Sequence, residues 1–317
     1  MCTAIFCKYE NAYFGRNLDL ERGYGERIVI TPRRYVIPLR HSQAMEYHYA
    51  MIGMATVINR FPLYYDATNE RGLSMAGLNF PDNAFYRGLA DSKDNITPFE
   101  FIPWVLGQCS SIREARLLIE QLNLTNTDFS EALPLTPLHW IISDKEGSIV
   151  IEPLKSGLAV YDNPFNVLTN NPPFEYHLSN ASNYMGLSAG AMQNKLSFKL
   201  PLKNYSLGMG ALGLPGDFSS ASRFIRALFV KENSILNNDE ASCVNQFFHI
   251  LNSVAMPKGC VAANDSFEYT RYSSCTNADT CVYYYTTYND FNIRSVRMHD
   301  TDIDSATLYT YEVNGLD

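Results

Sequence analysis

The spacing of apolar and polar positions predicts strands in the first 90 residues and again near the C-terminus. The early segments are rich in β-branched and aromatic residues, which favour strands, and cover residues 3–7, 13–17, 27–31 and 73–78. Two similar runs, 139–144 and 148–152, are joined through Lys145-Glu146-Gly147, which predicts a β-hairpin. Further strands are expected over residues 269–273 and 282–288.

Helical patterns lie between these strand-rich parts. Ser111 and Glu114 form a capping box, and behind it apolar residues recur at helical spacing at Ile112, Ala115, Leu118, Ile119 and Leu122. Thr97-Pro98 predicts another helix, with proline at its first position. Helices are also expected over 220–231 and 243–252, the second with a stripe at Val244, Phe247, Phe248 and Leu251. This order of elements favours a layered α+β fold, and the lack of a linker favours one domain over residues 1–317.

Charge and composition exclude several classes of protein. The chain has 317 residues, of which 46% are hydrophobic and 18% charged, as expected for a globular protein and not for a disordered one. It has 25 basic and 33 acidic residues, a net charge of −8, and its longest basic run is Arg33-Arg34. Because nucleic-acid binders normally show a basic excess or stripe, we expect no nucleic-acid partner.

We also expect no membrane span. Residues 49–58 form the most apolar stretch, and a spanning helix needs roughly twenty residues. The first residues show no basic segment followed by an apolar one, so no signal peptide is expected. These patterns predict a cytoplasmic protein.

The cysteines and histidines do not form a metal-binding or disulfide pattern. The seven cysteines include no CxxC pair, and their odd number does not suggest a complete disulfide framework; they are Cys2, Cys7, Cys109, Cys243, Cys260, Cys275 and Cys281. The six histidines are scattered without the spacing of metal ligands. We therefore expect free thiols, most of them in the core, and no metal.

Cys2 has chemistry that the other cysteines lack. Removal of Met1 would leave a cysteine whose free α-amino group lies next to its own thiol. The reference pKa values are about 8 for the amine and about 8.5 for the thiol, so both groups change protonation near neutral pH. The amine can then act as a general base for the thiol, and the thiolate is the nucleophile. A lone cysteine at this position is nevertheless more often a plain core residue.

Four other segments supply groups suited to work with a thiolate. Arg16 would favour the anion, and Asp19 would hold the amine, although the two residues also fit a surface ion pair in a turn. Asn79 ends an apolar run before proline, and Asn170 precedes Asn171 and Pro172. Asparagine is common in such turns, but its amide or a backbone N–H can also form an oxyanion hole.

The last of these segments carries a cation at an unfavourable place. Arg223 lies near the start of a predicted helix, where a positive charge opposes the helix dipole. That local disagreement indicates a functional task.

Together, these segments resemble the choloylglycine hydrolase family of N-terminal-nucleophile hydrolases, and within it the bile salt hydrolases of gut bacteria. The resemblance covers essentially the whole chain and rests on segments in family order, among them MCTAI, YFGRNLD, PLYYDATNERGL, AGLNFP, LPLTPLHW, NVLTNNP, GLPGD and SRFIRA. It implies a four-layer αββα sandwich, a homotetramer, no metal, no cofactor and maturation by removal of Met1.

The resemblance also implies a catalytic set and a substrate. The family's catalytic residues match Cys2, Arg16, Asp19, Asn79, Asn170 and Arg223. The implied reaction is hydrolysis of the amide of glycine- or taurine-conjugated bile salts through a thioester on Cys2. The steroid pocket would be lined by Leu18, Tyr24, Ile58, Tyr65, Phe129 and Leu133, each of which also fits ordinary packing.

Three alternatives remain open at this point. A penicillin V acylase would use the same machinery, but the acylases usually have tyrosine where this chain has Asn79. Transfer of the bile acyl group to another amine would need only a competing nucleophile at the thioester. A catalytically silent bile-acid-binding paralogue is disfavoured by the intact catalytic set.

Overall fold

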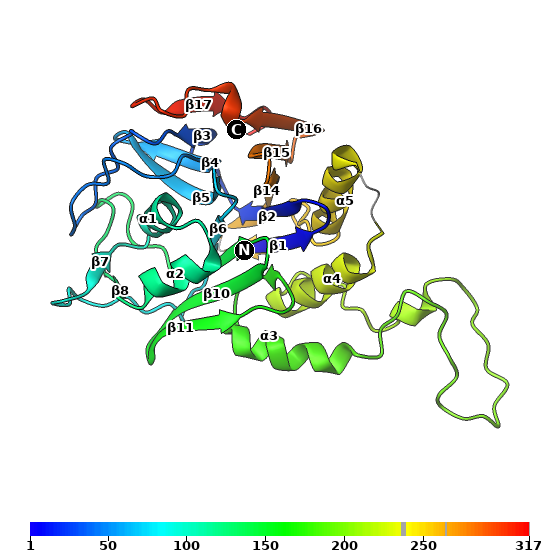
Figure 1. Ribbon diagram of the computed structural model, residues 1–317. Helices are drawn as coiled ribbons and strands as arrows, with labels where there is room; N and C mark the ends of the chain where they lie inside the picture. The colour runs from blue at the N-terminus through cyan, green and yellow to red at the C-terminus, as the bar shows by residue number, and fades with distance from the viewer. Residues whose placement is uncertain (236–238, 264, 317) are drawn as a thin grey trace.

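Two antiparallel sheets lie face to face, with helices against the outer face of each (Figure 1). The computed structural model describes residues 1–235, 239–263 and 265–316. Helices α1 (Phe101–Gln108) and α2 (Ile112–Ile119) pack on one sheet, and α4 (Ser220–Asn233) and α5 (Glu240–Asn252) pack on the other. The expected αββα sandwich is confirmed.

The N-terminal strand lies one strand in from the edge of the first sheet. Its order is β12 (Val167–Leu168), β1 (Cys2–Lys8), β2 (Ala12–Leu20), β14 (Ser266–Asn277), β15 (Val282–Thr287) and β16 (Asp290–Arg297), and β13 (Val261–Ala263) also pairs with β14. Strand β1 is therefore paired on both sides, and Figure 1 shows the N-terminus in the middle of the molecule.

The second sheet is built largely from the first half of the chain. Its order is β11 (Gly157–Asp162), β10 (Gly147–Leu154), β9 (Leu138–Asp144), β6 (Ser74–Asn79), β5 (Phe61–Asn69), β4 (Met51–Ile58), β3 (Glu26–Thr31) and β17 (Tyr309–Glu312). A small parallel pair, β7 (Asp94–Ile96) and β8 (Leu122–Leu124), lies outside both sheets, and α3 (Phe174–Ala181) follows β12.

Strand alternation divides the core into two clusters. In β3, Ile28 and Ile30 belong to the cluster that lies between the sheets and continues beneath α4 and α5, whereas Val29 belongs to the cluster beneath α1 and α2. Successive strand residues point to opposite faces, so one short apolar strand supplies both layers. This explains why the strands read as nearly continuous apolar runs.

The predicted strands are confirmed, several with longer bounds, and so are the helices at 220–231 and 243–252. The hairpin at 139–152 is also confirmed, with Gly147 at a φ of +149° as the first residue of β10. In α2 the Ser111 side chain accepts from the Glu114 N–H at 3.3 Å, as a capping box requires, while Glu114 bonds back to Ser110 instead.

The prediction of a helix start at Thr97-Pro98 is wrong. Helix α1 begins at Phe101, and Glu100 is its N-cap. The Glu100 N–H donates to the Thr97 carbonyl at 3.0 Å, and the Thr97 N–H donates to Glu100 Oε2 at 3.0 Å. These two bonds close a turn over residues 97–100 before the helix begins.

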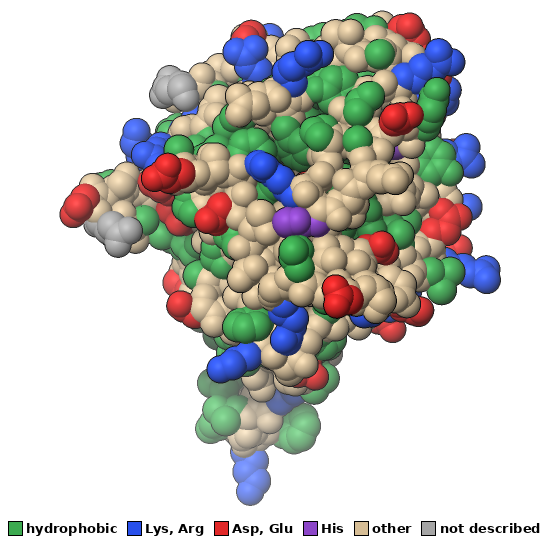
Figure 2. All heavy atoms as spheres, turned by 90° about the vertical axis from the view of Figure 1, so that its left-hand side faces the viewer, with side chains coloured by type: hydrophobic (Ala, Val, Ile, Leu, Met, Phe, Trp, Pro, Cys, Tyr) green, Lys and Arg blue, Asp and Glu red, His purple; other side chains and the backbone are tan. Residues whose placement is uncertain are grey.

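The surface does not concentrate positive charge on the face shown in Figure 2, where basic and acidic side chains are interspersed. Among the described residues, no helix is long and apolar enough to cross a membrane.

Close approach of β2 and β14 leads to a test of the fold. A Cβ on Gly15 would lie 1.9 Å from the Ser274 carbonyl oxygen, a backbone atom that cannot move aside. We expect Gly15→Ala to destabilise the protein by about 3 kcal/mol or more. In Gly88→Ala the new Cβ meets nothing within 4 Å, so its free energy of unfolding should stay within about 0.5 kcal/mol of the wild type. Urea unfolding compares the two, and equal stabilities would contradict the sheet packing described here.

Candidate active site

Cys2 is the first residue of β1 and is buried, with 3% of its surface exposed. Register places it opposite Leu18 of β2. Its backbone N–H donates to Asn170 Oδ1 at 2.8 Å. Met1 precedes it here, so the nitrogen that would become the α-amine is an amide with its position already fixed.

Arg16 lies beside Cys2 within the same pair of strands. Its side chain is fully buried, and Nη1 donates to the carbonyls of Tyr65, at 3.0 Å, and Gly77. Burial alone would lower the pKa of Arg16, but the negative charges of its neighbours, that of a Cys2 thiolate foremost, hold it above its ordinary value. The guanidinium therefore stays charged and favours the thiolate.

Asp19 adjoins the peptide bond between Met1 and Cys2. Its N–H donates to the Met1 carbonyl at 3.0 Å, and Oδ1 accepts from the Thr270 hydroxyl at 2.6 Å. Its other oxygen, Oδ2, is buried and has no hydrogen-bond partner within the part of the chain that the structure describes. A carboxylate oxygen kept free at this place suits a cationic amine.

Asn170 connects Cys2 to the other sheet. Its Oδ1 accepts from Cys2, and its Nδ2 donates to the carbonyl of Asn79 at 2.6 Å. Asn79 is the last residue of β6. The two asparagines predicted from separate turns thus meet beside the thiol, one from each sheet.

Arg223 points back from the first turn of α4 into the same network. Nη2 donates to Asn170 Oδ1 at 2.7 Å, and Nη1 donates to the Cys2 carbonyl and to Thr3 Oγ1, the latter at 2.7 Å. Burial lowers the pKa of Arg223, while the charges of Asp19 and Cys2 act in the opposite direction. Its unfavourable place in the helix is explained by these contacts.

The predicted lining residues fall into separate groups. Leu18 is opposite Cys2, and Tyr65 accepts from Arg16 through its carbonyl. Ile58 pairs with Phe61 at the hairpin of β4 and β5, and the Phe61 ring lies 6.0 Å from that of Phe129.

Leu133 and Tyr24 lie on loops. Leu133 closes a turn with Ser130, and Tyr24 is 38% exposed in the connection between β2 and β3. The structure therefore places Leu18 and Tyr65 beside the catalytic candidates, and the other four around the second sheet and its loops.

A buried carboxylate that balances the charge of Arg16 was not predicted from the sequence. Asp66 of β5 accepts from the hydroxyls of Tyr272 at 2.7 Å, Tyr283 at 2.9 Å and Ser274 at 3.2 Å. Burial raises the pKa of Asp66, and the charge of Arg16 opposes that rise. Its signal was available in the segment FPLYYDA, where an acid interrupts a run of apolar and aromatic residues.

The backbone of Asn170 is also held by residues that the sequence analysis did not select. Its N–H donates to Ser220 Oγ at 2.8 Å, and its carbonyl accepts from His177 Nε2 at 3.2 Å. Burial lowers the pKa of His177 to about 4, so this histidine is neutral at pH 7. No local pattern marks either residue, because each bonds the backbone of Asn170 from another element, Ser220 from α4 and His177 from α3.

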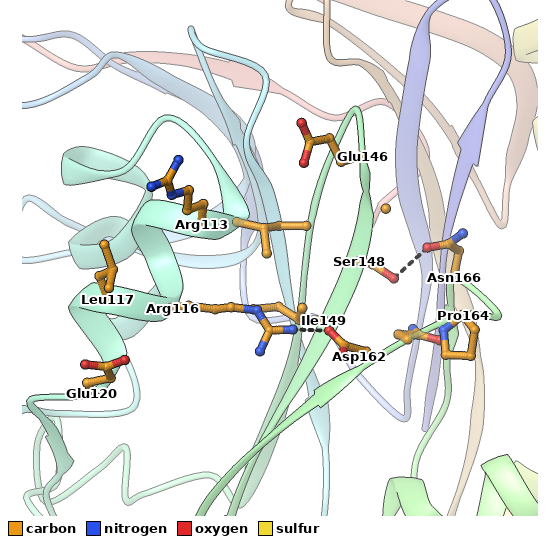
Figure 3. Close-up of a pocket in the computed structure, with 13 residues that line it drawn as sticks. Arg113, Arg116, Leu117, Glu120, Glu146, Ser148, Ile149, Asp162, Pro164 and Asn166 are labelled. Atoms are coloured by element: carbon orange, nitrogen blue, oxygen red, sulfur yellow. Dashed lines mark hydrogen bonds and ion pairs between the residues drawn. The ribbon is translucent and has the colours of Figure 1, made fainter.

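A separate groove of about 750 Å³ lies beside α2 (Figure 3). Its other wall is formed by the turn between β9 and β10, the start of β10 and the segment that follows β11. Arg116 crosses it to Asp162, and the lining also includes Arg113, Glu120 and Glu146. None of the predicted catalytic or pocket residues lines this groove. The chemistry centred on Cys2 therefore lies elsewhere.

Comparison with known proteins agrees with this geometry. Residues 2–311 match the family described as linear amide C–N hydrolases, choloylglycine hydrolase family. A bile salt hydrolase/transferase of Lactiplantibacillus plantarum is 52% identical over 312 residues, which are 98% of this chain and 96% of the relative. A bile salt hydrolase/transferase of Clostridium perfringens is 36% identical over an alignment of 323 positions that covers 99% of this chain and 97% of the relative.

Solved structures show the same fold. A crystal structure of a mutant conjugated bile acid hydrolase from Clostridium perfringens superposes with a TM-score of 0.92 at 36% identity, covering 100% of this chain and 98% of the other. A penicillin V acylase from Agrobacterium tumefaciens, 17% identical, superposes with a TM-score of 0.77 over 98% of this chain and 91% of the other, which shows a shared fold alone. The chain belongs to the choloylglycine hydrolase family of linear amide C–N hydrolases.

Proposed function

We propose that the protein hydrolyses the amide that joins a bile acid to glycine or taurine, with Cys2 as the nucleophile. The observation that carries this proposal is the single hydrogen-bond network that joins Cys2, Asn79, Asn170 and Arg223. The thiolate attacks the amide carbon and forms a thioester, and the Cys2 α-amine, exposed once Met1 is removed, delivers the proton to the leaving amine. Water then releases the free bile acid.

The roles of the surrounding groups follow from their contacts. Arg16 favours the thiolate, and the free Oδ2 of Asp19 receives the α-amine. The oxyanion is met by the Asn79 backbone N–H and by the second N–H of Asn170 Nδ2. Removing one such donor typically raises the barrier by about 3 kcal/mol, a few hundredfold in rate. Arg223 keeps Oδ1 of Asn170 turned away from the oxyanion.

The substrate class rests on the relatives and on Asn79, where penicillin V acylases usually have tyrosine. The relatives from Lactiplantibacillus plantarum and Clostridium perfringens are named bile salt hydrolase/transferase. Leu18, Tyr24, Ile58, Tyr65, Phe129 and Leu133 are proposed to line an apolar steroid pocket. Transfer of the bile acyl group from the thioester to an amine is proposed as a side activity, since it needs only an amine in place of water.

Substitution of Cys2 tests the nucleophile. We expect Cys2→Ala to release glycine from glycocholate at less than about a thousandth of the wild-type rate, because loss of a nucleophile typically costs more than this. The matched control is Cys7→Ala, since Cys7 is a buried thiol on the same strand, and it should keep a near-normal kcat. Near-normal release by the Cys2 variant would overturn the assignment.

A kcat/KM higher for penicillin V than for glycocholate would place the wild type with the acylases.

A second test concerns the free amine. We expect an extension between Met1 and Cys2, ending in a protease site, to give a folded protein with its thiol intact and little activity. General acid–base assistance is worth roughly 10²–10⁴ in rate, and an amide nitrogen has no usable basicity near neutral pH. Glycine release is measured before and after cleavage, with mass spectrometry of the N-terminus. Full activity with the extension still attached would exclude the amine as the base.

We propose that the protein is a one-domain cytoplasmic homotetramer. Support for one domain comes from the core between the sheets, whose residues run from Cys2 to Val313. Six buried free thiols suit a reducing compartment. Support for assembly comes from residues 186–212, here called the arm, which extends away from the sheets between α3 and α4 (Figure 1). Its exposed apolar side chains include Leu196, Phe198, Leu202, Tyr205 and Leu207.

The arm gives a test of assembly. Phe198 is 99% exposed and Leu207 is 101% exposed, and large exposed apolar patches commonly mark protein interfaces. We expect Phe198→Asp combined with Leu207→Asp to convert a tetramer into smaller species, measured by light scattering after gel filtration. Lys199→Ser combined with Lys203→Ser changes the same arm without touching its apolar side chains and should assemble normally. A wild-type monomer would exclude the proposal.

A further inference from the structure

A buried histidine and glutamate lie directly behind the two asparagines. His139 of β9 and Glu152 of β10 both have 0% exposure, and His139 Nδ1 lies 3.0 Å from Glu152 Oε1. The other ring nitrogen, Nε2, lies 2.9 Å from the Thr169 carbonyl. A carbonyl oxygen only accepts, so Nε2 carries a hydrogen and donates it to Thr169.

This pair holds both ends of the segment that carries Asn170. His139 bonds the Thr169 carbonyl at its start, and Glu152 accepts from the Phe174 N–H at its end, at 3.0 Å. The peptide between Thr169 and Asn170 is thereby fixed on both sides, because its N–H donates to Ser220 Oγ at 2.8 Å. A peptide plane bonded through both its C=O and its N–H cannot rotate without breaking a buried hydrogen bond, which is costly.

The same imidazole also contacts the segment that carries Asn79. The Phe80 ring stacks on the His139 ring with centroids 4.2 Å apart and planes 5° apart. Register places His139 opposite Leu78 on the neighbouring strand β6, one residue before Asn79. One side chain therefore touches a neighbour of each proposed oxyanion donor.

We propose that His139, anchored by Glu152, is a positioning residue that sets the separation of the two oxyanion donors. It acts through the Thr169 carbonyl and the Phe80 ring. This inference rests on the proposed function of Asn79 and Asn170, and it adds the device that fixes them relative to one another across the two sheets.

Two substitutions of similar polarity separate positioning from simple packing. The amide nitrogen of glutamine reaches the place of Nε2, whereas that of asparagine reaches only the place of Nδ1. We expect His139→Asn to lower kcat for glycocholate about 100-fold, since displacement of a reacting geometry by about 1 Å costs that much, with KM within threefold of the wild type. His139→Gln restores the donor to Thr169 and should keep kcat within about fivefold. His249→Asn, the same substitution at an exposed position of α5, is the control and should leave kcat unchanged.

Crystal structures of both variants supply a readout that does not depend on activity. In His139→Asn the bond from Asn170 Nδ2 to the Asn79 carbonyl, 2.6 Å in the wild type, should lengthen or break, and in His139→Gln it should persist. Equal losses of kcat in the two variants, or an unchanged Asn170 in the asparagine variant, would overturn the proposal. A wild type that fails to release glycine refutes the proposed function instead, and the crystal structures still decide the role of His139.

A further variant covers the case in which His139→Asn does not fold. Phe80→Leu removes the stacked ring and leaves both hydrogen bonds of the imidazole in place. We expect it to lower kcat about fivefold to tenfold with little change in KM. An unchanged kcat would show that the ring stack does not position Asn79 and would overturn that half of the proposal.

Discussion

The site depends on the pairing of β1 on both of its edges. Strand β2 places Leu18 opposite Cys2, and β12 places Leu168 opposite Ala4. Two residues beyond the Ala4–Leu168 pair, antiparallel register brings Asn170 level with Cys2, and the observed hydrogen bond of 2.8 Å follows. A strand terminus would ordinarily fray, but this one is held from both sides. Backbone pairing thus gives Cys2, the proposed nucleophile, and Asn170, a proposed oxyanion donor, a fixed relation to one another.

Two arginines can be buried beside one thiol because the charge of each guanidinium is balanced by nearby acceptors. Arg16 has Asp66 and backbone carbonyls around it, and Arg223 binds the Cys2 carbonyl and Asn170. A buried charge without partners would be very costly. The same low-polarity surroundings strengthen the effect of the remaining positive charge on the thiolate. The same contacts therefore serve both stability and reactivity. We expect substitution of either arginine by lysine to lower both stability and activity.

Strand and helix positions could be predicted from the sequence because local spacing determines them. The stripe of Val244, Phe247 and Leu251 is an example, since each of these side chains is buried in α5. The start of α1 could not be predicted, because the bonds between Glu100 and Thr97 form a turn that its Thr-Pro signal does not distinguish from a cap.

The residues of the site also divide into those that could be predicted from the sequence and those that could not. The chemistry of Cys2 made it a candidate, and the resemblance over long motifs supported that candidate and predicted its five companions. His139 could not be selected, since its importance lies in its contact with Thr169 across the two sheets. Asp66 had a local signal, an acid within a mostly apolar strand, but its contacts with Tyr272 and Tyr283, which lie far away in the sequence, could not be predicted. The residues next to them in the sequence do not indicate such long-range contacts.

The hydrogen-bond network fixes the orientation of the Asn170 side-chain amide, which Asn170 alone would leave open. Oδ1 accepts from both the Cys2 nitrogen and Arg223 Nη2, so the amide is turned with Nδ2 toward Asn79. An α-amine formed by loss of Met1 would still donate to Oδ1, because an ammonium or amine nitrogen carries hydrogens as the amide does. The orientation therefore does not depend on maturation. In the proposed mechanism, loss of Met1 changes the basicity of the Cys2 nitrogen, and the proposed oxyanion donors are already in place before that base is exposed.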